Sequence, residues 1–520
     1  MNPAGDLDTL VDALLREQQA LTAVDRFALH HSPLASPHAG ALYSALLPSS
    51  PPGPGHQYAF EVDMDSCSGC KACVTACHSL NGLEDGEFWR DTGLIRGSEP
   101  NGAAYQQTIT SACHHCADPA CLEGCPVEAY HKDPRTGIVR HRDDQCIGCQ
   151  YCVLKCPYDV PKYSEKLGIV RKCDMCSQRL AVGEAPACVQ ACPGEAIRIR
   201  IVETEALPHK NHDTLVPGAF DSAYTRPSTI YLNSRPIPGD ASPADAETPR
   251  AEPPHWPLAF MLLLTQAALG TFAARCIPAF DWSASECLAL SLSSWALLHA
   301  GLAASLLHLG RPLGAWRFFL GLRTSWMSRE ILALGLFSAA GTLSAAVDLL
   351  LVLQHTPPNL RAWVATAAIP IHWSTFAMAT TALGCSAMIY IDTHRILWRA
   401  AQTFPRFLGT SLLLGSAATL CLRPQTPGLA LGICLLQCLL LAWELPSPRQ
   451  SSPPLRRPPM LVLRVISALC GALSALLAPL SGSRTAALLA LGSCALGQLL
   501  ERHLFFTCVR AHRMPGIPSR

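Results

Sequence analysis

The chain has 520 residues, of which 49% are hydrophobic, and a formal net charge of +1. This length predicts two or three domains. A near-neutral charge gives no electrostatic attraction for a polyanion, so no nucleic-acid partner is expected. The 25 Cys would be unusual in a disulfide framework, which suits small secreted domains. Because the first residues show no signal peptide, we expect these thiols to be metal ligands.

Residues 1–56 are predicted to hold one helix and a loop. Apolar residues recur at helical spacing from Leu7 to Leu15 within residues 6–28, which indicates an amphipathic helix. Residues 32–56 are rich in Pro, Ser and Gly and indicate a loop. The helix either packs on its own domain or docks a partner subunit.

Sixteen Cys in the next part of the chain form four groups of four. Three thiolates two residues apart can wrap a loop around one cubane, while the fourth Cys begins the next helix and points to another cluster. Thiolate is also the soft ligand that iron–sulfur clusters require. The groups are Cys67, Cys70, Cys73 and Cys77; Cys113, Cys116, Cys121 and Cys125; Cys146, Cys149, Cys152 and Cys156; and Cys173, Cys176, Cys188 and Cys192.

These groups favour iron–sulfur clusters over zinc. A single C-x2-C pair would fit zinc, but three of the four groups end in Cys-Pro, which is typical of [4Fe–4S] ferredoxins. The first group departs from this pattern, since His78 follows Cys77. The sequence predicts an α+β ferredoxin-like domain over residues 57–235, with two pseudo-repeated units that each hold a pair of clusters.

The remainder of the chain is predicted to lie mostly in a membrane. Residues 236–255, rich in Pro, Ala and acidic side chains, indicate a linker. Residues 256–510 contain long apolar runs that predict an all-α bundle of about eight transmembrane helices, and residues 511–520 form a tail. The runs lie near 256–280, 286–309, 330–354, 363–391, 405–422, 427–444, 460–480 and 485–506.

Arg residues divide unequally between the two sides of this predicted bundle. Fifteen lie on the side that carries the Cys-rich domain and four on the opposite side. The positive-inside rule then predicts a multi-pass protein of the cytoplasmic membrane, with the Cys-rich domain facing the cytoplasm. Alternatively, these Arg residues dock the domain and carry no information on topology.

Residues 305–331 join two predicted helices and place His308 and Glu330 at the membrane edge on the cluster side. Oxidation of a quinol releases two protons and two electrons, so a proton acceptor is needed beside the electron acceptor, and a His with a carboxylate supplies one. The alternative is a pair of interfacial residues without catalytic function. Haem is a rival cofactor with His299, His308 and His372 as candidate ligands, but we expect none.

The Cys-rich region resembles the iron–sulfur subunit of the dimethyl sulfoxide reductase family over residues 57–205. The order of the groups and the motifs CHHCADPACLEGCP, CIGCQYCVLKCPYDVPKY and KCDMC carry the resemblance. It implies four [4Fe–4S] clusters, because all sixteen Cys are kept. The implied ligand sets are Cys67, Cys70, Cys73 and Cys192; Cys173, Cys176, Cys188 and Cys77; Cys113, Cys116, Cys121 and Cys156; and Cys146, Cys149, Cys152 and Cys125.

The membrane half resembles the anchor subunit of the same family, mainly in residues 305–331. His308 matches the His of the family's H-L-G-x-P motif, and Glu330 matches the Glu that opens the next helix. The resemblance implies that both act in menaquinol oxidation. GQLLERHLFF resembles the family's G-E-x-x-x-R pattern, with Gln498 in place of Glu.

Together these features predict a non-catalytic subunit that relays electrons between menaquinol, or another quinone, and a separate molybdopterin-containing catalytic subunit. The alternatives are the same relay run in reverse from a cytoplasmic sulfite-oxidising or similar dehydrogenase, or a relay that serves nitrate reduction.

Overall fold

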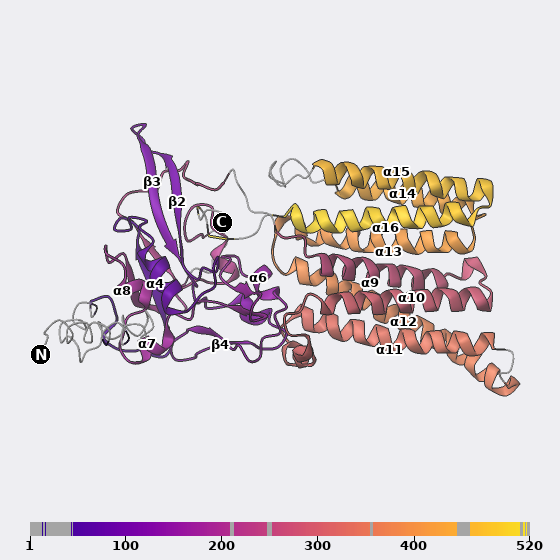
Figure 1. Ribbon diagram of the computed structural model, residues 1–520, viewed down its shortest axis with the longest axis horizontal. Coiled ribbons are helices and arrows are strands. Elements are labelled where there is room, and N and C mark those ends of the chain that lie inside the picture. The colour runs from indigo at the N-terminus through magenta and orange to yellow at the C-terminus, as the bar shows by residue number, and fades with distance from the viewer. Residues whose placement is uncertain are drawn as a thin grey trace, which may run out of the picture.

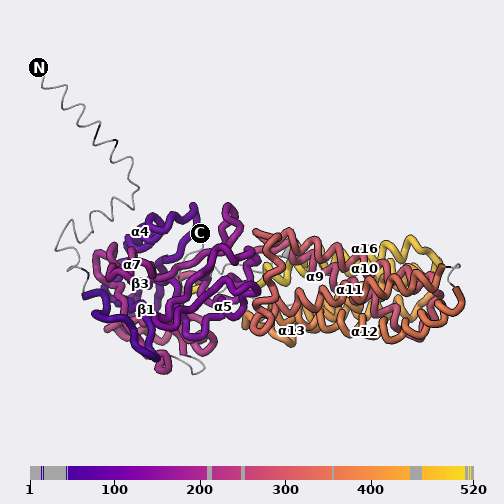
Figure 2. The backbone as a smooth tube through the Cα atoms, turned by 90° about the horizontal axis from the view of Figure 1, so that it is seen from below, coloured from indigo at the N-terminus to yellow at the C-terminus, as the bar shows by residue number. Residues whose placement is uncertain are grey.

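A computed structural model describes residues 45–207, 213–246, 252–353, 357–444 and 458–509, with six single positions nearer the two ends. The chain forms two parts that lie end to end along the longest axis, a mixed domain of small sheets and a bundle of long helices (Figure 1). The same arrangement is seen from below in Figure 2. The predicted amphipathic helix of residues 6–28 lies outside the described ranges.

Two three-stranded sheets and two short hairpins form the framework of the Cys-rich domain. In the first sheet the central strand β1 pairs antiparallel with β8 and parallel with β9, and in the second β2 pairs antiparallel with β3 and β10. The strands are β1 (His56–Asp63), β2 (Asp91–Ser98), β3 (Ala104–Ser111), β4 (Tyr130–Lys132), β5 (Val139–His141), β6 (Lys162–Ser164), β7 (Ile169–Arg171), β8 (Ile197–Glu203), β9 (Ile230–Leu232) and β10 (Ser242–Pro243).

Short helices follow the Cys-rich loops. Lys71, Gln150 and Cys176 each adopt the left-handed backbone conformation immediately before such a helix. This conformation turns the chain sharply, as a loop wrapped around a cluster requires. The helices are α4 (Ala72–Leu80), α5 (Ala120–Glu123), α6 (Tyr151–Lys155), α7 (Ser177–Ala181) and α8 (Ala187–Gln190). The prediction of a ferredoxin-like α+β domain is confirmed.

Eight long helices form the second part, and seven of them, within the described residues, are long and apolar enough to cross a membrane. The eighth, α16, is not among the seven, and Glu501, Arg502 and His503 lie in its last two turns. The helices are α9 (Trp256–Arg275), α10 (Ala284–Leu306), α11 (Trp326–Val352), α12 (Pro358–Ile391), α13 (Ala400–Leu422), α14 (Pro427–Glu444), α15 (Pro458–Ser481) and α16 (Arg484–Thr507).

The long helices lie side by side along the molecule's length (Figure 1). At the contact of α9 with α13, Gly270 and Gly415 let the two backbones approach closely, since an added Cβ on Gly270 would lie 1.8 Å from the Ser411 carbonyl oxygen. Small residues at such contacts are typical of packing between transmembrane helices.

Two segments predicted to lie outside the domains pack against the Cys-rich domain. Residues 242–243 of the predicted linker form β10 and pair with β2. In the predicted tail, Met514 is fully buried in the core of that domain, and the Gly516 carbonyl accepts a hydrogen bond from Leu94 of β2. After α16 the chain therefore returns from the membrane bundle to the Cys-rich domain.

Candidate electron-transfer site

Three hollows in the Cys-rich domain are each lined by four Cys from two different sequence groups. Each set combines three Cys of one group with the last Cys of another, as cross-ligation of paired clusters requires. The sets are Cys67, Cys70, Cys73 and Cys192; Cys113, Cys116, Cys121 and Cys156; and Cys125, Cys146, Cys149 and Cys152. These are three of the four ligand sets that the family resemblance implies.

The fourth implied set is also brought together. The Cys77 thiol interacts electrostatically with the thiols of Cys188 and Cys176, and the Cys173 thiol interacts with those of Cys77 and Cys188. All sixteen thiols are free of disulfides. The described residues contain no group of three His, Cys, Asp or Glu side chains that could hold a single metal ion, whereas the thiols arranged around hollows suit the larger volume of a cubane.

Two buried cations lie between these sets. Burial alone would lower the pKa of Arg90, but the thiolates of Cys188 and Cys73, which belong to two sets, raise it. The Lys172 ammonium group lies 3.6 Å from the Cys113 sulfur. Burial would likewise lower the pKa of Lys172, and nearby thiolates raise it. Fixed positive charges here stabilise the additional negative charge of a reduced cluster.

The set that includes Cys125 and Cys149 lies against the membrane bundle. In Figure 1, α6, which contains Cys152, lies next to the bundle, and α4 and α8, which contain Cys of the more distant sets, lie farther away. The 3-10 segment Pro312–Gly321 follows α10 and lies against the same set, since an added Cβ on Gly321 would lie 2.7 Å from the Cys125 carbonyl oxygen. Its Gly321 amide donates to the Pro126 carbonyl oxygen over 3.0 Å.

Further hydrogen bonds hold this contact. The Arg311 amide donates to the Ile147 carbonyl oxygen over 3.0 Å. The Arg311 and Arg317 guanidinium groups donate to the carbonyl oxygens of Asp143 and Asp144. Some of the Arg residues that favour a cytoplasmic orientation therefore also dock the Cys-rich domain, as the alternative interpretation proposed.

Glycines allow the two backbones to meet. A Cβ added to Gly310, in the His-Leu-Gly-Arg-Pro stretch, would lie 2.2 Å from the Gly168 carbonyl oxygen. Gly148, between Cys146 and Cys149, has φ of 68°, and its added Cβ would lie 2.4 Å from the same oxygen. Only glycines permit so close an approach between the anchor and the cluster loop.

Apolar and charged contacts extend the interface around α6. Tyr151 and Leu154 of α6 belong to one buried apolar cluster with Trp398 and Phe506 of the bundle. The Lys155 ammonium group lies 2.6 Å from a carboxylate oxygen of Asp392, which follows α12. The two parts are thus joined by a continuous core, which indicates a fixed relative position rather than a flexible tether.

His308 lies at this interface, two residues beyond α10. The backbone of Cys149 lies beside its ring, and burial together with the charge of His255 lowers the pKa of His308 to about 4. The ring centroids of His308 and His255 are 5.4 Å apart. His308 therefore lies on the cluster side of the bundle, and its position at the membrane edge stays a prediction.

Glu330 lies in the first turns of α11 and is buried. Its carboxylate accepts a hydrogen bond from the Ser386 hydroxyl of α12. Two residues earlier, the Ser328 hydroxyl donates to the Pro126 carbonyl oxygen over 3.3 Å, so this helix also begins against the cluster domain. Within the described part of the chain, His308 and Glu330 do not hydrogen-bond to each other.

The other candidate histidines have protein partners. The His299 ring lies 2.8 Å from the Trp295 carbonyl oxygen and 2.9 Å from the Ser338 hydroxyl. The His372 ring lies 3.3 Å from the carboxylate of Asp348, which also pairs with Arg275. The three histidines considered as haem ligands thus have separate surroundings.

A buried polar network that was not predicted from the sequence lies at the end of α16. The Arg502 guanidinium group donates to Gln266 of α9 and to Thr410 of α13, each over 2.8 Å. Thr410 in turn donates to Gln498, the residue that departs from the family pattern, over 2.7 Å. Glu501 pairs with Arg502. The signal was the occurrence of adjacent charges inside an apolar helix, which are costly unless paired.

Comparison with known proteins agrees with this geometry. The 4Fe-4S dicluster domain family matches residues 105–201, and the family described as the DMSO reductase anchor subunit (DmsC) matches residues 252–441. The B subunit of the anaerobic dimethyl sulfoxide reductase of Escherichia coli K12 is 36% identical over 197 residues, which cover 36% of this chain and 94% of the relative. The chain belongs to the dimethyl sulfoxide reductase family of iron–sulfur and anchor subunits.

Two further proteins are similar to part of this chain. The hydrogenase-2 operon protein HybA of Escherichia coli O157:H7 is 38% identical over 38% of this chain and 71% of its own length. The thiosulfate reductase electron transfer subunit PhsB of Salmonella typhi is 38% identical over 29% of this chain and 79% of its own. This member of the reductase family is an electron-transfer subunit that carries [4Fe–4S] clusters, fused to a multi-pass membrane anchor.

Proposed function

We propose that this reductase-family subunit relays electrons between a quinone bound in its anchor and a separate molybdopterin-containing catalytic subunit. The contact between the Cys149 loop and the segment from His308 to Ser328 carries the proposal. It would bring a proton acceptor, His308, beside the cluster that receives the electrons. Catalysis of quinol oxidation needs both acceptors at one place.

The proposed cofactors are four [4Fe–4S] clusters held by the sixteen Cys in the cross-ligated sets given above. The clusters accept and pass on single electrons. The surrounding protein places the Lys172 and Arg90 charges between the Cys sets. Because the sets are distributed from α6, beside the bundle, to α4 and α8 (Figure 1), their order suits a relay through the domain rather than one reaction centre.

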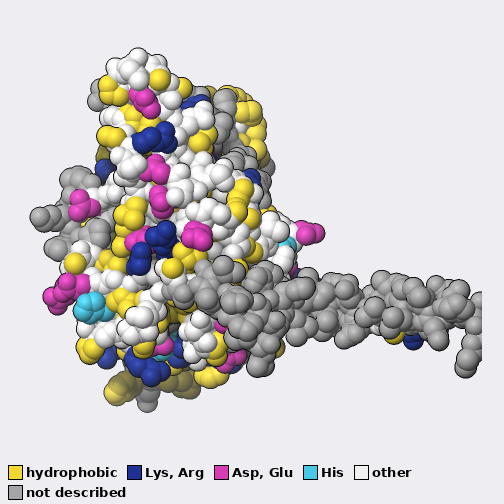
Figure 3. Space-filling view, turned by 90° about the vertical axis from the view of Figure 1, so that its left-hand side faces the viewer, with side chains coloured by type: hydrophobic (Ala, Val, Ile, Leu, Met, Phe, Trp, Pro, Cys, Tyr) yellow, Lys and Arg dark blue, Asp and Glu magenta, His cyan; other side chains and the backbone are white. Residues whose placement is uncertain are grey.

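We propose that the catalytic subunit binds at the end of the cluster domain that faces away from the bundle. Cys70, the exposed member of its set, lies in the loop before α4 in this region. The face seen in Figure 3 carries acidic and basic side chains among apolar ones. Such a mixed surface suits a polar protein interface.

The proposed location is the cytoplasmic membrane, with the cluster domain in the cytoplasm. Support comes from the excess of Arg on the domain's side, although Arg311 and Arg317 dock the domain. A reporter fused to the C-terminus should behave as cytoplasmic. An extracytoplasmic reporter would contradict this orientation.

The test of the relay is reduction of the clusters by menaquinol in the anaerobically purified chain. Replacement of His308 by Ala should abolish reduction by quinol while reduction by dithionite is unchanged, because dithionite needs no proton acceptor in the anchor. Wild-type quinol kinetics in H308A would remove this residue from the mechanism.

A second direction of electron flow has specific support. The relatives include a protein of a hydrogenase operon as well as subunits of reductases. The same relay run toward the quinone, from a sulfite-oxidising or similar dehydrogenase, is therefore the alternative, and nitrate is an alternative substrate for the reductive direction. Identification of the co-purifying large subunit would distinguish these cases.

A further inference from the structure

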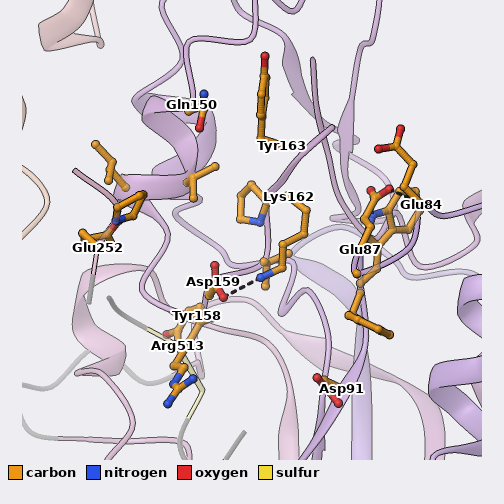
Figure 4. A pocket seen from close by; sticks show the side chains of 18 of the residues that line it. Glu84, Glu87, Asp91, Gln150, Tyr158, Asp159, Lys162, Tyr163, Glu252 and Arg513 are labelled. Atoms are coloured by element: carbon orange, nitrogen blue, oxygen red, sulfur yellow. Dashed lines mark hydrogen bonds and ion pairs between the residues drawn. The ribbon is translucent and has the colours of Figure 1, made fainter. Parts of the chain in front are cut away.

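A large cavity lies between the cluster domain and the residues that lead into α9. Its volume is about 520 Å³. At one end it is lined by Glu252, His255 and Arg395, and at the other by Glu84 and Asp85. Figure 4 shows Glu252 on one side and Glu84 and Glu87 on the other, with the Asp159–Lys162 ion pair between them.

The cavity has an excess of carboxylates in its lining and reaches the surface. Seven of its lining residues are Asp or Glu, and three are Lys or Arg. Asp85 and Glu165, at its outer end, are exposed, whereas Glu252, at its inner end, is buried. A water-filled space with an excess of carboxylates attracts protons and conducts them toward bulk solvent.

His255 links this cavity to the proposed quinol site. Its ring lies 5.4 Å from the His308 ring, centroid to centroid, in an edge-to-face arrangement. Its Nε2 atom is buried without a hydrogen-bond partner, and lies 3.9 Å from a Glu252 carboxylate oxygen. Two imidazole rings at this centroid separation can exchange a proton directly or through one water molecule when their nitrogens face each other.

The backbone holds His255 in an unusual position. Its φ of 43° is in the left-handed region at the start of α9, which is uncommon for a residue other than glycine. The Phe506 ring packs 5.4 Å away on another side. The charged neighbours are Glu252 and, paired with it, Arg395. A side chain held in this way by its surroundings is typical of a functional position.

We propose that His255 transfers the protons released by quinol oxidation from His308 to water in this cavity. Each quinol gives one quinone, two electrons and two protons. A cluster held by the set that includes Cys149 would take up the electrons. Each proton passes from His308 to one nitrogen of His255, whose other nitrogen releases a proton to the cavity. This inference rests on the proposed function, and His255 itself does not need to contact the quinol.

The test uses the full-length chain with its clusters and measures menaquinol-driven cluster reduction by stopped-flow absorbance. His255→Ala should lower the rate at saturating quinol by about tenfold or more, increase the solvent deuterium isotope effect and leave the KM for quinol unchanged. Added imidazole should restore the rate, because it can enter the cavity. His255→Gln should be as slow but resist rescue, since Gln fills the space.

The controls separate this inference from the proposed function. His394→Ala changes another interfacial histidine, which packs on Tyr224 and does not line the cavity, and should keep the wild-type rate. Wild-type rates in both His255 variants, with H308A inactive, would overturn the inference alone. A wild-type rate in H308A would remove His308 from the mechanism, and wild-type clusters that menaquinol does not reduce would overturn the proposed function. If His255→Ala loses iron, His255→Gln decides the outcome by itself.

Discussion

Replacement of Gly310 by Ala perturbs the closest approach between the anchor and the clusters. The added Cβ would lie 2.2 Å from the Gly168 carbonyl oxygen and 2.6 Å from its carbonyl carbon. Since non-bonded heavy atoms are ordinarily separated by roughly 3.5 Å, the two backbones must separate by about 1 Å. Overpacking of this kind costs about 1–3 kcal/mol, and a misplacement of this size can lower a rate by roughly a hundredfold.

The assay compares quinol and dithionite as reductants of the same purified variant. We expect G310A to bind its full complement of iron and to be reduced by dithionite at the wild-type rate, but to be reduced by menaquinol about tenfold to a hundredfold more slowly. Gly335→Ala is the matched control, because a Cβ on Gly335 of α11 meets no atom within 4 Å. Wild-type quinol kinetics in G310A would refute a positioning role for this contact.

Three other predictions concern the charges. Lys172→Met should lower the reduction potential of the adjacent clusters by about 60 mV for each 1.4 kcal/mol of stabilisation lost, and an unchanged or raised potential in a redox titration would contradict it. Arg502→Leu removes one of the two arginine partners of buried Glu501 and leaves only Arg406, 3.5 Å away, so thermal unfolding should show a loss of at most about 3–5 kcal/mol; a wild-type melting temperature would contradict the assignment of this pair as structural. Burial alone would raise the pKa of Glu252, but His255 and Arg395 lower it to about 2. The ionised Glu252 carboxylate therefore stabilises the fold above the ordinary carboxyl pKa of about 4.3. This stabilisation is lost as the pH falls from there toward 2. Glu252→Gln should flatten the pH dependence of stability in this range, and an unchanged acid profile would argue against it.

The ferredoxin-like domain and the long helices were predictable from the sequence because their signals are local. The spacing of Cys146, Cys149 and Cys152 within one loop indicates a cubane by itself. Likewise, apolar runs of about 20 residues predict spans, and the eight predicted runs correspond to α9–α16.

The contacts between distant segments were not predictable in the same way. Nothing near Gly310 in the sequence indicates that it meets Gly168, and Met514 belongs to a tail that returns to the cluster domain. His255 lies in a Pro-rich stretch that resembles a linker, and only the fold brings it beside His308. These features depend on the packing of one domain on the other, for which a single sequence has no periodic signal.

The proposed relay depends on direct passage of electrons from quinol in the anchor to the clusters of the same chain. The full-length protein, purified anaerobically, should contain about sixteen iron atoms per chain, as four cubanes require. Electron paramagnetic resonance of this protein after addition of menaquinol alone tests the direct transfer. We expect the wild-type spectrum to show signals of interacting reduced clusters. H308A should lack these signals after menaquinol is added and should show them after dithionite is added. Clusters that dithionite reduces but menaquinol leaves oxidised in the wild-type chain would contradict direct transfer.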